Sequence, residues 1–116
     1  MITESRKSRD AISMVIDVCD TLAEIVPATL DEFITDTRTQ WAVEMGLIRI
    51  GEGVNRIPNA VLTKFDAQPW RQIVGMRNFA AHQYDDLNPR RVWRTVTIEV
   101  PALRAYLADI VLPGVS

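Results

Sequence analysis

The sequence has 116 residues, of which 47% are hydrophobic and 24% are charged, so its composition is that of one folded domain rather than of a disordered chain. The formal net charge of −2 excludes a broadly basic surface as the means of binding nucleic acid. A single cysteine, Cys19, excludes an internal disulfide, and no run of 18 apolar residues is present that would cross a membrane. We therefore expect a single cytoplasmic domain over residues 1–116.

The first elements are read from apolar residues that recur at helical spacing. This spacing predicts a helix over residues 6–26, with Ser5 as its N-cap and Pro27 marking its end. A single extra turn is expected over residues 30–34, and Asp31 is the candidate cap for it.

Residues 37–57 predict a central helix, because apolar residues occupy two of its sides. One side carries the series Val43, Leu47, Ile50, Val54 and Ile57. The opposite side carries Trp41, Met45 and Ile48. This second series continues to Glu52, which either reaches solvent or is buried as the partner of a basic group such as Arg77. Gly51 and Gly53 are expected to allow close packing rather than to bind phosphate.

Prolines and a capping pair divide the second half of the chain. Pro58 ends the central helix, a turn or short helix follows over residues 59–65, and Pro69 suits the first position of a helix that runs to residue 84 or 85. Asn88 followed by Pro89 predicts the start of the last helix.

The last helix contains an irregular stretch. Residues 95–100 are rich in β-branched side chains and could form a strand, but an apolar series on both sides favours a helix in which Pro101 introduces a kink. The whole pattern predicts an all-α bundle of four or five helices with a kinked C-terminal helix.

The segment 76–84 holds the residues that suggest chemistry. Arg77 and Tyr84 are seven residues apart and share one helical stripe, and Asn78 and His82 share a neighbouring one. His82 is the only histidine in the chain, so catalysis that uses both a histidine acid and a histidine base would need two copies of the chain. The residues alone leave two interpretations open: His82 and Arg77 cleave a phosphodiester, or they are an interior histidine and a structural ion pair.

Further candidates lie after this segment. A local cluster, Arg90, Arg91 and Arg94, could contact RNA or could be a solvated helix face. No group of carboxylates and histidines has metal-ligand spacing, so we expect neither a metal nor a cofactor.

The run from Arg77 to Tyr84 resembles the Arg-x4-His-x-Tyr motif of the HepT toxins, a branch of the HEPN ribonucleases. The resemblance extends to Ile-Gly-Glu at residues 50–52 and to Pro69 followed by Trp70. It implies a bundle of HEPN type, a dimer with a composite cleft, metal-independent RNA cleavage by Arg77 and His82 with Asn78 and Glu52 in support, and possible higher oligomers. It also implies a type II toxin–antitoxin system, in which an MNT-type nucleotidyltransferase antitoxin transfers AMP to Tyr84.

Two other functions are compatible with the sequence. The chain could be a non-catalytic helical subunit that binds a nucleotide or substrate for a partner nucleotidyltransferase, or it could be a plain interaction domain. A cleavage assay on RNA separates the first of these from a ribonuclease.

Overall fold

The computed structural model describes the backbone of residues 4–82 and 88–115 and the side chains of residues 5–77 and 88–115. Within these ranges all regular structure is helical, which confirms the predicted all-α class. The bundle is about 46 Å long and 26 Å across.

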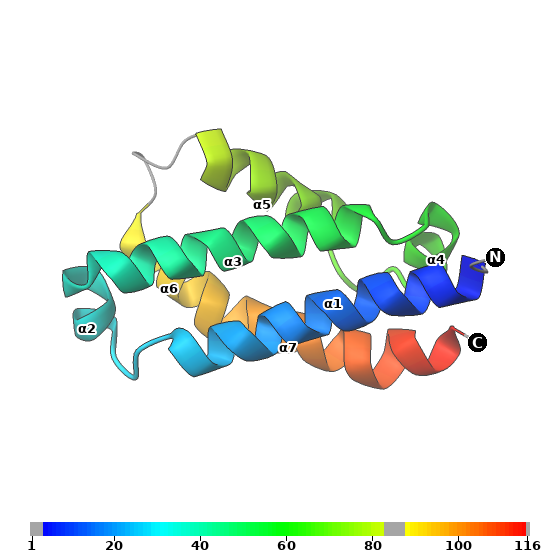
Figure 1. Cartoon of the computed structure of the whole chain (residues 1–116), viewed down its shortest axis with the longest axis horizontal. Helices are drawn as coiled ribbons and strands as arrows, with labels where there is room; N and C mark the ends of the chain where they lie inside the picture. Colours follow the sequence, from blue (N-terminus) through cyan, green and yellow to red (C-terminus); the bar gives the residue numbers. More distant parts are fainter. Residues whose placement is uncertain (1–3, 83–87, 116) are drawn as a thin grey trace.

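Three long helices and a continuous C-terminal helical run form the bundle (Figure 1). The long helices are α1 (Glu4–Ile25), α3 (Thr37–Asn55) and α5 (Trp70–His82), and the short ones are α2 (Leu30–Thr35) and α4 (Asn59–Lys64). The C-terminal run consists of α6 (Pro89–Arg94), η2 (Thr95–Glu99), α7 (Val100–Tyr106), η3 (Leu107–Val111) and η4 (Leu112–Gly114). The prediction of four long helices with one or two short ones is therefore confirmed.

Helix α3 lies between α5 and α1 in Figure 1 and packs extensively against both, while α7 packs against α1 from behind. The predicted apolar series of α3 faces inward, and its members Val43, Ile50 and Val54 are fully buried. They join one core with Ile12 and Leu22 of α1 and with residues of the C-terminal run. Burial of this continuous apolar surface is the main force that holds the helices together.

Side-chain caps define where the helices begin. Thr29, not Asp31, caps α2, because its hydroxyl accepts the Glu32 backbone N–H. Asp36 caps α3 by accepting from the backbone N–H of Thr39, and the hydrogen bonds from Thr39 lower the pKa of this carboxyl. Ser5 lies inside α1 rather than at its cap, since the helix already includes Glu4.

Asn88 caps α6 through the backbone N–H of Arg90, as predicted, and Pro89 is the first helical residue. The irregularity expected before Pro101 takes the form of a π-helical turn, η2, over Thr95–Glu99. Proline cannot donate a backbone hydrogen bond and crowds the preceding turn, and a wider turn accommodates both effects.

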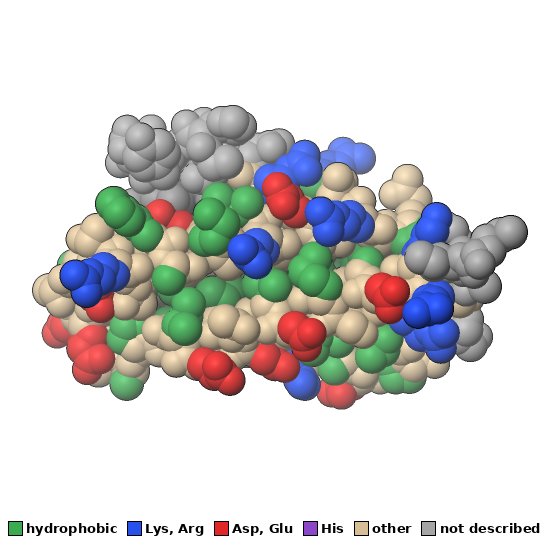
Figure 2. Space-filling view, in the orientation of Figure 1, with side chains coloured by type: hydrophobic (Ala, Val, Ile, Leu, Met, Phe, Trp, Pro, Cys, Tyr) green, Lys and Arg blue, Asp and Glu red, His purple; other side chains and the backbone are tan. Residues whose placement is uncertain are grey.

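The second apolar series of α3 is mostly exposed, with only Ile48 partly buried. Trp41 is 68% exposed and Met45 is 52% exposed, so the expectation that both sides of this helix are buried is wrong. α3 packs against α5 at Gly51 and against α1 at Gly53, and its buried side carries Val43 and Ile50. The side that carries Trp41 and Met45 faces outward. Figure 2 shows hydrophobic side chains exposed on the face that α3 occupies in Figure 1.

Candidate active site

Helix α5 carries Arg77 and His82, and its first residue is fixed to the preceding connection. Trp70 is buried, and its indole N–H donates to the backbone carbonyls of Leu62, at 3.1 Å, and Phe65, at 2.7 Å. The indole also packs against the ring of Tyr106, with 6.1 Å between the ring centroids. These contacts set the position at which α5 leaves the α4 connection.

The middle of α5 is held against α3 at Gly51. A Cβ atom at position 51 would lie 2.8 Å from the Cβ of Arg77 and 3.1 Å from both the Arg77 backbone nitrogen and the Ile73 carbonyl oxygen. The two helices therefore approach as closely as they do because residue 51 has no side chain. The prediction that Gly51 serves packing is confirmed, and Gly53 does the same against Met14 and Val15 of α1.

Arg77 is half-buried and has an interaction partner within the chain. It lies on the inner stripe of α5, as its place in the apolar periodicity predicts. Asn78 and His82 belong to the same helix, whose described part runs to His82. Their side chains, and the whole of Tyr84, lie outside the described part of the structure. The predicted end of this helix at residue 84 or 85 lies outside the described residues as well.

Glu52 is exposed on the outward side of α3. The sequence allowed either exposure to solvent or burial beside a basic group such as Arg77, and the structure shows exposure to solvent. It shares that side with Trp41 and Met45, eleven and seven residues earlier, which is the spacing of one helical stripe.

The HepT-like family model, described as "Ribonuclease HepT-like", matches residues 15–110. The chain belongs to the HepT-like ribonuclease family. A protein of Caldanaerobacter subterraneus subsp. tengcongensis, named "Putative RNase TTE0752", is 30% identical over 103 residues, which cover 88% of this chain and 92% of that one. The protein named "Probable ribonuclease HepT" of Thermococcus cleftensis is 29% identical over 100 residues, which cover 85% and 91%. No solved structure matches the chain.

The all-α bundle agrees with a HEPN fold for this HepT-like ribonuclease. Among the described residues, no three His, Cys, Asp or Glu side chains are grouped where they could hold a metal ion. No helix within residues 4–82 and 88–115 is long and apolar enough to span a membrane.

A cleft of about 570 Å³ lies between α5 and the C-terminal helical run of the HepT-like chain. Arg91 and Arg94 line it together with Gln68, Gln72 and Met76, whereas Arg90 does not. This cleft could not be predicted from the sequence, because its two walls are about twenty residues apart and helical spacing relates only residues within one helix.

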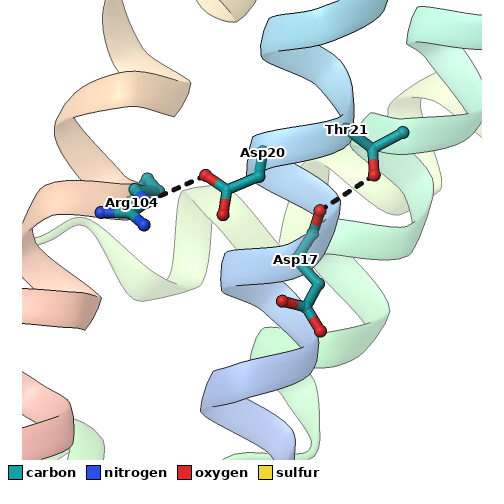
Figure 3. Close-up of polar contacts among 4 residues, drawn as sticks. All are labelled: Asp17, Asp20, Thr21 and Arg104. Carbon is teal, nitrogen blue, oxygen red and sulfur yellow. Dashed lines mark hydrogen bonds and ion pairs between the residues drawn. The ribbon is translucent and has the colours of Figure 1, made fainter.

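An ion pair joins α1 and α7 of the HepT-like chain. Arg104 Nε donates to Asp20 Oδ1 at 2.9 Å, and this hydrogen bond raises the pKa of Arg104; Figure 3 also shows the Thr21 hydroxyl donating to the Asp17 carbonyl. Both members of the ion pair are about half exposed, so it contributes little to stability.

Cys19 precedes Asp20 on α1, and burial together with the Asp20 carboxylate raises the pKa of the Cys19 thiol to about 12. A thiol that stays protonated at neutral pH is not a nucleophile.

Proposed function

We propose that this HepT-like chain is the toxin of a type II toxin–antitoxin system and acts as a metal-independent endoribonuclease through Arg77 and His82. The observation that carries the proposal is the place of these two residues on one helix, α5, in a chain matched by the family model over residues 15–110. Arg77 supplies a permanent positive charge. His82 is the only histidine in the chain, and histidine is the residue type that ordinarily exchanges a proton near neutral pH.

The reaction is an attack of the RNA 2′-hydroxyl on the neighbouring phosphorus. A new bond forms between the 2′-oxygen and phosphorus, the bond to the 5′-oxygen of the next nucleotide breaks, and the products are a 2′,3′-cyclic phosphate and a 5′-hydroxyl. Arg77 stabilises the charge that develops on the non-bridging oxygens. His82 takes the proton of the 2′-hydroxyl or gives a proton to the leaving oxygen, and the His82 of a second copy performs the other transfer.

This use of two histidines requires a homodimer. The outward side of α3 offers the surface for it, since Trp41 and Met45 are exposed there and α3 is the helix against which α5 packs. A two-fold axis at this surface would place the two copies of α5 on either side of one shared cleft. Glu52 and Asn78 would support the site from α3 and α5, respectively.

The proposal includes a partner that controls the toxin. A neighbouring nucleotidyltransferase of MNT type transfers AMP to the Tyr84 hydroxyl, which lies two residues beyond His82 in the sequence. The added phosphate brings negative charge to the place where the substrate phosphate must bind, so modification blocks RNA without unfolding the protein.

One observation favours a second function. The cleft beside α5 contains two arginines and an apolar floor, which suits a nucleotide held for a partner enzyme rather than cleaved. A non-catalytic binding subunit of a nucleotidyltransferase pair is therefore the alternative.

The test is a cleavage assay with purified protein, a labelled single-stranded RNA and excess EDTA. Cleavage by the wild type to cyclic phosphate ends, with a loss of at least a hundredfold in Arg77→Ala and in His82→Ala, supports the proposal. The same RNA with 2′-deoxyribose at the cleaved position is the matched substrate control and should stay intact. Cleavage by both variants at the wild-type rate, or of the deoxy control, would contradict the mechanism.

A further inference from the structure

The cleft between α5 and the C-terminal helical run differs chemically from one side to the other. Its floor is apolar and formed by buried side chains, among them Ile73, Val100 and Leu103. Its rim carries six polar side chains: Gln68, Gln72, Arg91, Arg94, Thr95 and Glu99. A floor that can take a flat ring and a rim that can bind polar groups are typical of sites for small ligands, and about 570 Å³ is within the usual range of volumes.

The two arginines provide the charge for a phosphate. Arg91 and Arg94 are three residues apart on α6 and therefore lie on the same side of that helix, and both line the cleft. Each guanidinium can bind phosphate oxygens with two parallel hydrogen bonds. The chain as a whole has a net charge of −2, so this pair is a local attraction rather than part of a basic surface.

The remaining polar groups suit the edge of a nucleobase. Gln68 and Gln72 can both donate and accept hydrogen bonds, whereas ionised Glu99 can only accept. A carboxylate in this place repels a second phosphate and favours a base that has an exocyclic amino group. Met76, also in the lining, provides a polarisable contact for the face of the ring.

The cleft lies next to Arg77, the arginine proposed for catalysis, but does not include it. Met76 lines the cleft, and the following residue, Arg77, packs against Gly51 of α3. Successive residues of a helix point about 100° apart, so the cleft and Arg77 occupy neighbouring sides of α5. A single-stranded RNA whose scissile phosphate lies at Arg77 can therefore continue into the cleft.

From these observations we infer that the cleft binds one nucleotide of the single-stranded RNA substrate beside the scissile phosphate, with its phosphate on Arg91 and Arg94 and its base over the apolar floor. The inference rests on the proposed ribonuclease function and adds a subsite to it. Glu99 then makes the site select bases with an amino group at that position. An acidic segment of a partner protein is the competing occupant, and the experiment separates the two.

The experiment measures binding of a fluorescent 2′-O-methyl RNA hexamer, which lacks the attacking hydroxyl, by anisotropy at several salt concentrations. The variant is Arg91→Gln/Arg94→Gln. Its matched control is Lys7→Gln/Arg9→Gln, which removes the same charge from exposed positions of α1 outside the cleft. We expect the first variant to bind at least tenfold more weakly. The slope of log affinity against log salt concentration should become shallower by about 0.7, the value for one lost phosphate contact to a single strand. The control should stay within about twofold of the wild type.

A second readout locates the ligand directly. Methionine methyl groups labelled with carbon-13 are followed by NMR while CMP is added as the probe, since CMP has both a phosphate and an amino-bearing base. The Met76 signal should shift. The Met14 signal should not, because Met14 lies on α1 and packs against Gly53 of α3, outside the cleft. The Met76 shift should be lost in Arg91→Gln/Arg94→Gln.

The outcomes distinguish the subsite from the function on which it rests. If the wild type neither binds the hexamer nor cleaves RNA, the proposed function fails and the subsite fails with it. If the wild type binds and cleaves RNA while Arg91→Gln/Arg94→Gln equals its control, the ribonuclease stands and the subsite is overturned. A Met76 shift with an acidic peptide but not with CMP or RNA also overturns it.

Discussion

Gly51 of α3 and Arg77 of α5 touch so closely that a Cβ atom at position 51 would lie 2.8 Å from that of Arg77. Two of the three atoms nearest to that added Cβ belong to the α5 backbone, at 3.1 Å, so a side chain there could not be accommodated by turning a flexible neighbour. The arginine proposed for catalysis is thus positioned by the absence of a side chain on the adjacent helix.

Gly51→Ala should therefore displace α5 from α3 and disturb the site. Overpacking of this kind lowers the free energy of unfolding by about 1–3 kcal/mol, partly offset by the higher helix propensity of alanine. We expect RNA cleavage to fall by at least tenfold while far-UV circular dichroism remains helical. Urea unfolding and the cleavage assay measure the two effects.

Gly75→Ala is the matched control, because a Cβ at that position of α5 has no neighbour within 4 Å. It should raise the free energy of unfolding by up to about 1 kcal/mol through helix propensity alone, and it should keep the cleavage activity. Equal activity in the two variants would show that the contact between Gly51 and Arg77 does not position the site.

Helical periodicity was sufficient to predict the all-α class and the order of the described helices, since the buried series of α3 recurs at regular spacing. It could not predict which apolar face would be covered. Trp41 and Met45 have the same spacing as Val43 and Leu47, yet only the latter pair is buried. Coverage depends on where distant helices pack, and one segment carries no information about that.

The same limit applies to the candidate site. Arg77 could be named as a candidate site residue because it is a charged residue within an apolar series of one helix, which is a local signal. The cleft was not, because it joins Gln72 and Met76 of α5 to Arg91 and Arg94 of α6 across the bundle. The available signals were Gln68 and Gln72, four residues apart, and Arg91 and Arg94, three residues apart. Nothing in the sequence showed that these two pairs face each other.

The exposed side of α3 predicts the oligomeric state. Trp41→Glu combined with Met45→Glu places charge on the proposed two-fold interface, and we expect it to convert a dimer to a monomer with unchanged helical content. Light scattering after gel filtration measures the mass. RNA cleavage should be lost with the dimer.

Ile110→Glu is the control, because Ile110 is also about half exposed, at 51%, but belongs to η3 of the C-terminal run. It should leave the mass of the assembly unchanged. A wild-type protein that is monomeric at micromolar concentration would exclude the shared site.

The raised pKa of the Cys19 thiol should lower the free energy of unfolding at alkaline pH. Its pKa is raised to about 12 in the folded protein from an ordinary value of 9.0, so above pH 9 the unfolded chain loses the thiol proton while the folded chain keeps it. Deprotonation then favours unfolding, and the contribution of this group, complete below pH 9, falls by about 1.4 kcal/mol per pH unit between pH 9 and 12.

The measurement compares urea unfolding of the wild type and Cys19→Ala at pH 8 and pH 10. The difference between the two proteins should change by about 1.4 kcal/mol in favour of Cys19→Ala at pH 10, since the variant lacks the titrating group. Other alkaline groups cancel in the comparison. An unchanged difference would mean that the folded protein admits the thiolate.

Tyr84 predicts where the partner enzyme acts. Its hydroxyl is two residues from His82 in the sequence, and we expect the neighbouring nucleotidyltransferase to attach AMP to it when the two proteins are produced together. The chain has one other tyrosine, Tyr106, which is half-buried and whose hydroxyl lies 3.4 Å from the Ala67 backbone nitrogen, which donates to it. Intact-mass measurement should therefore find the added mass of AMP on the wild type and on Tyr106→Phe, but not on Tyr84→Phe. The modified wild type should no longer cleave RNA, because the new phosphate competes with the substrate for Arg77. Relief of toxicity with no added mass on the wild type would show instead that the partner neutralises the toxin by binding alone.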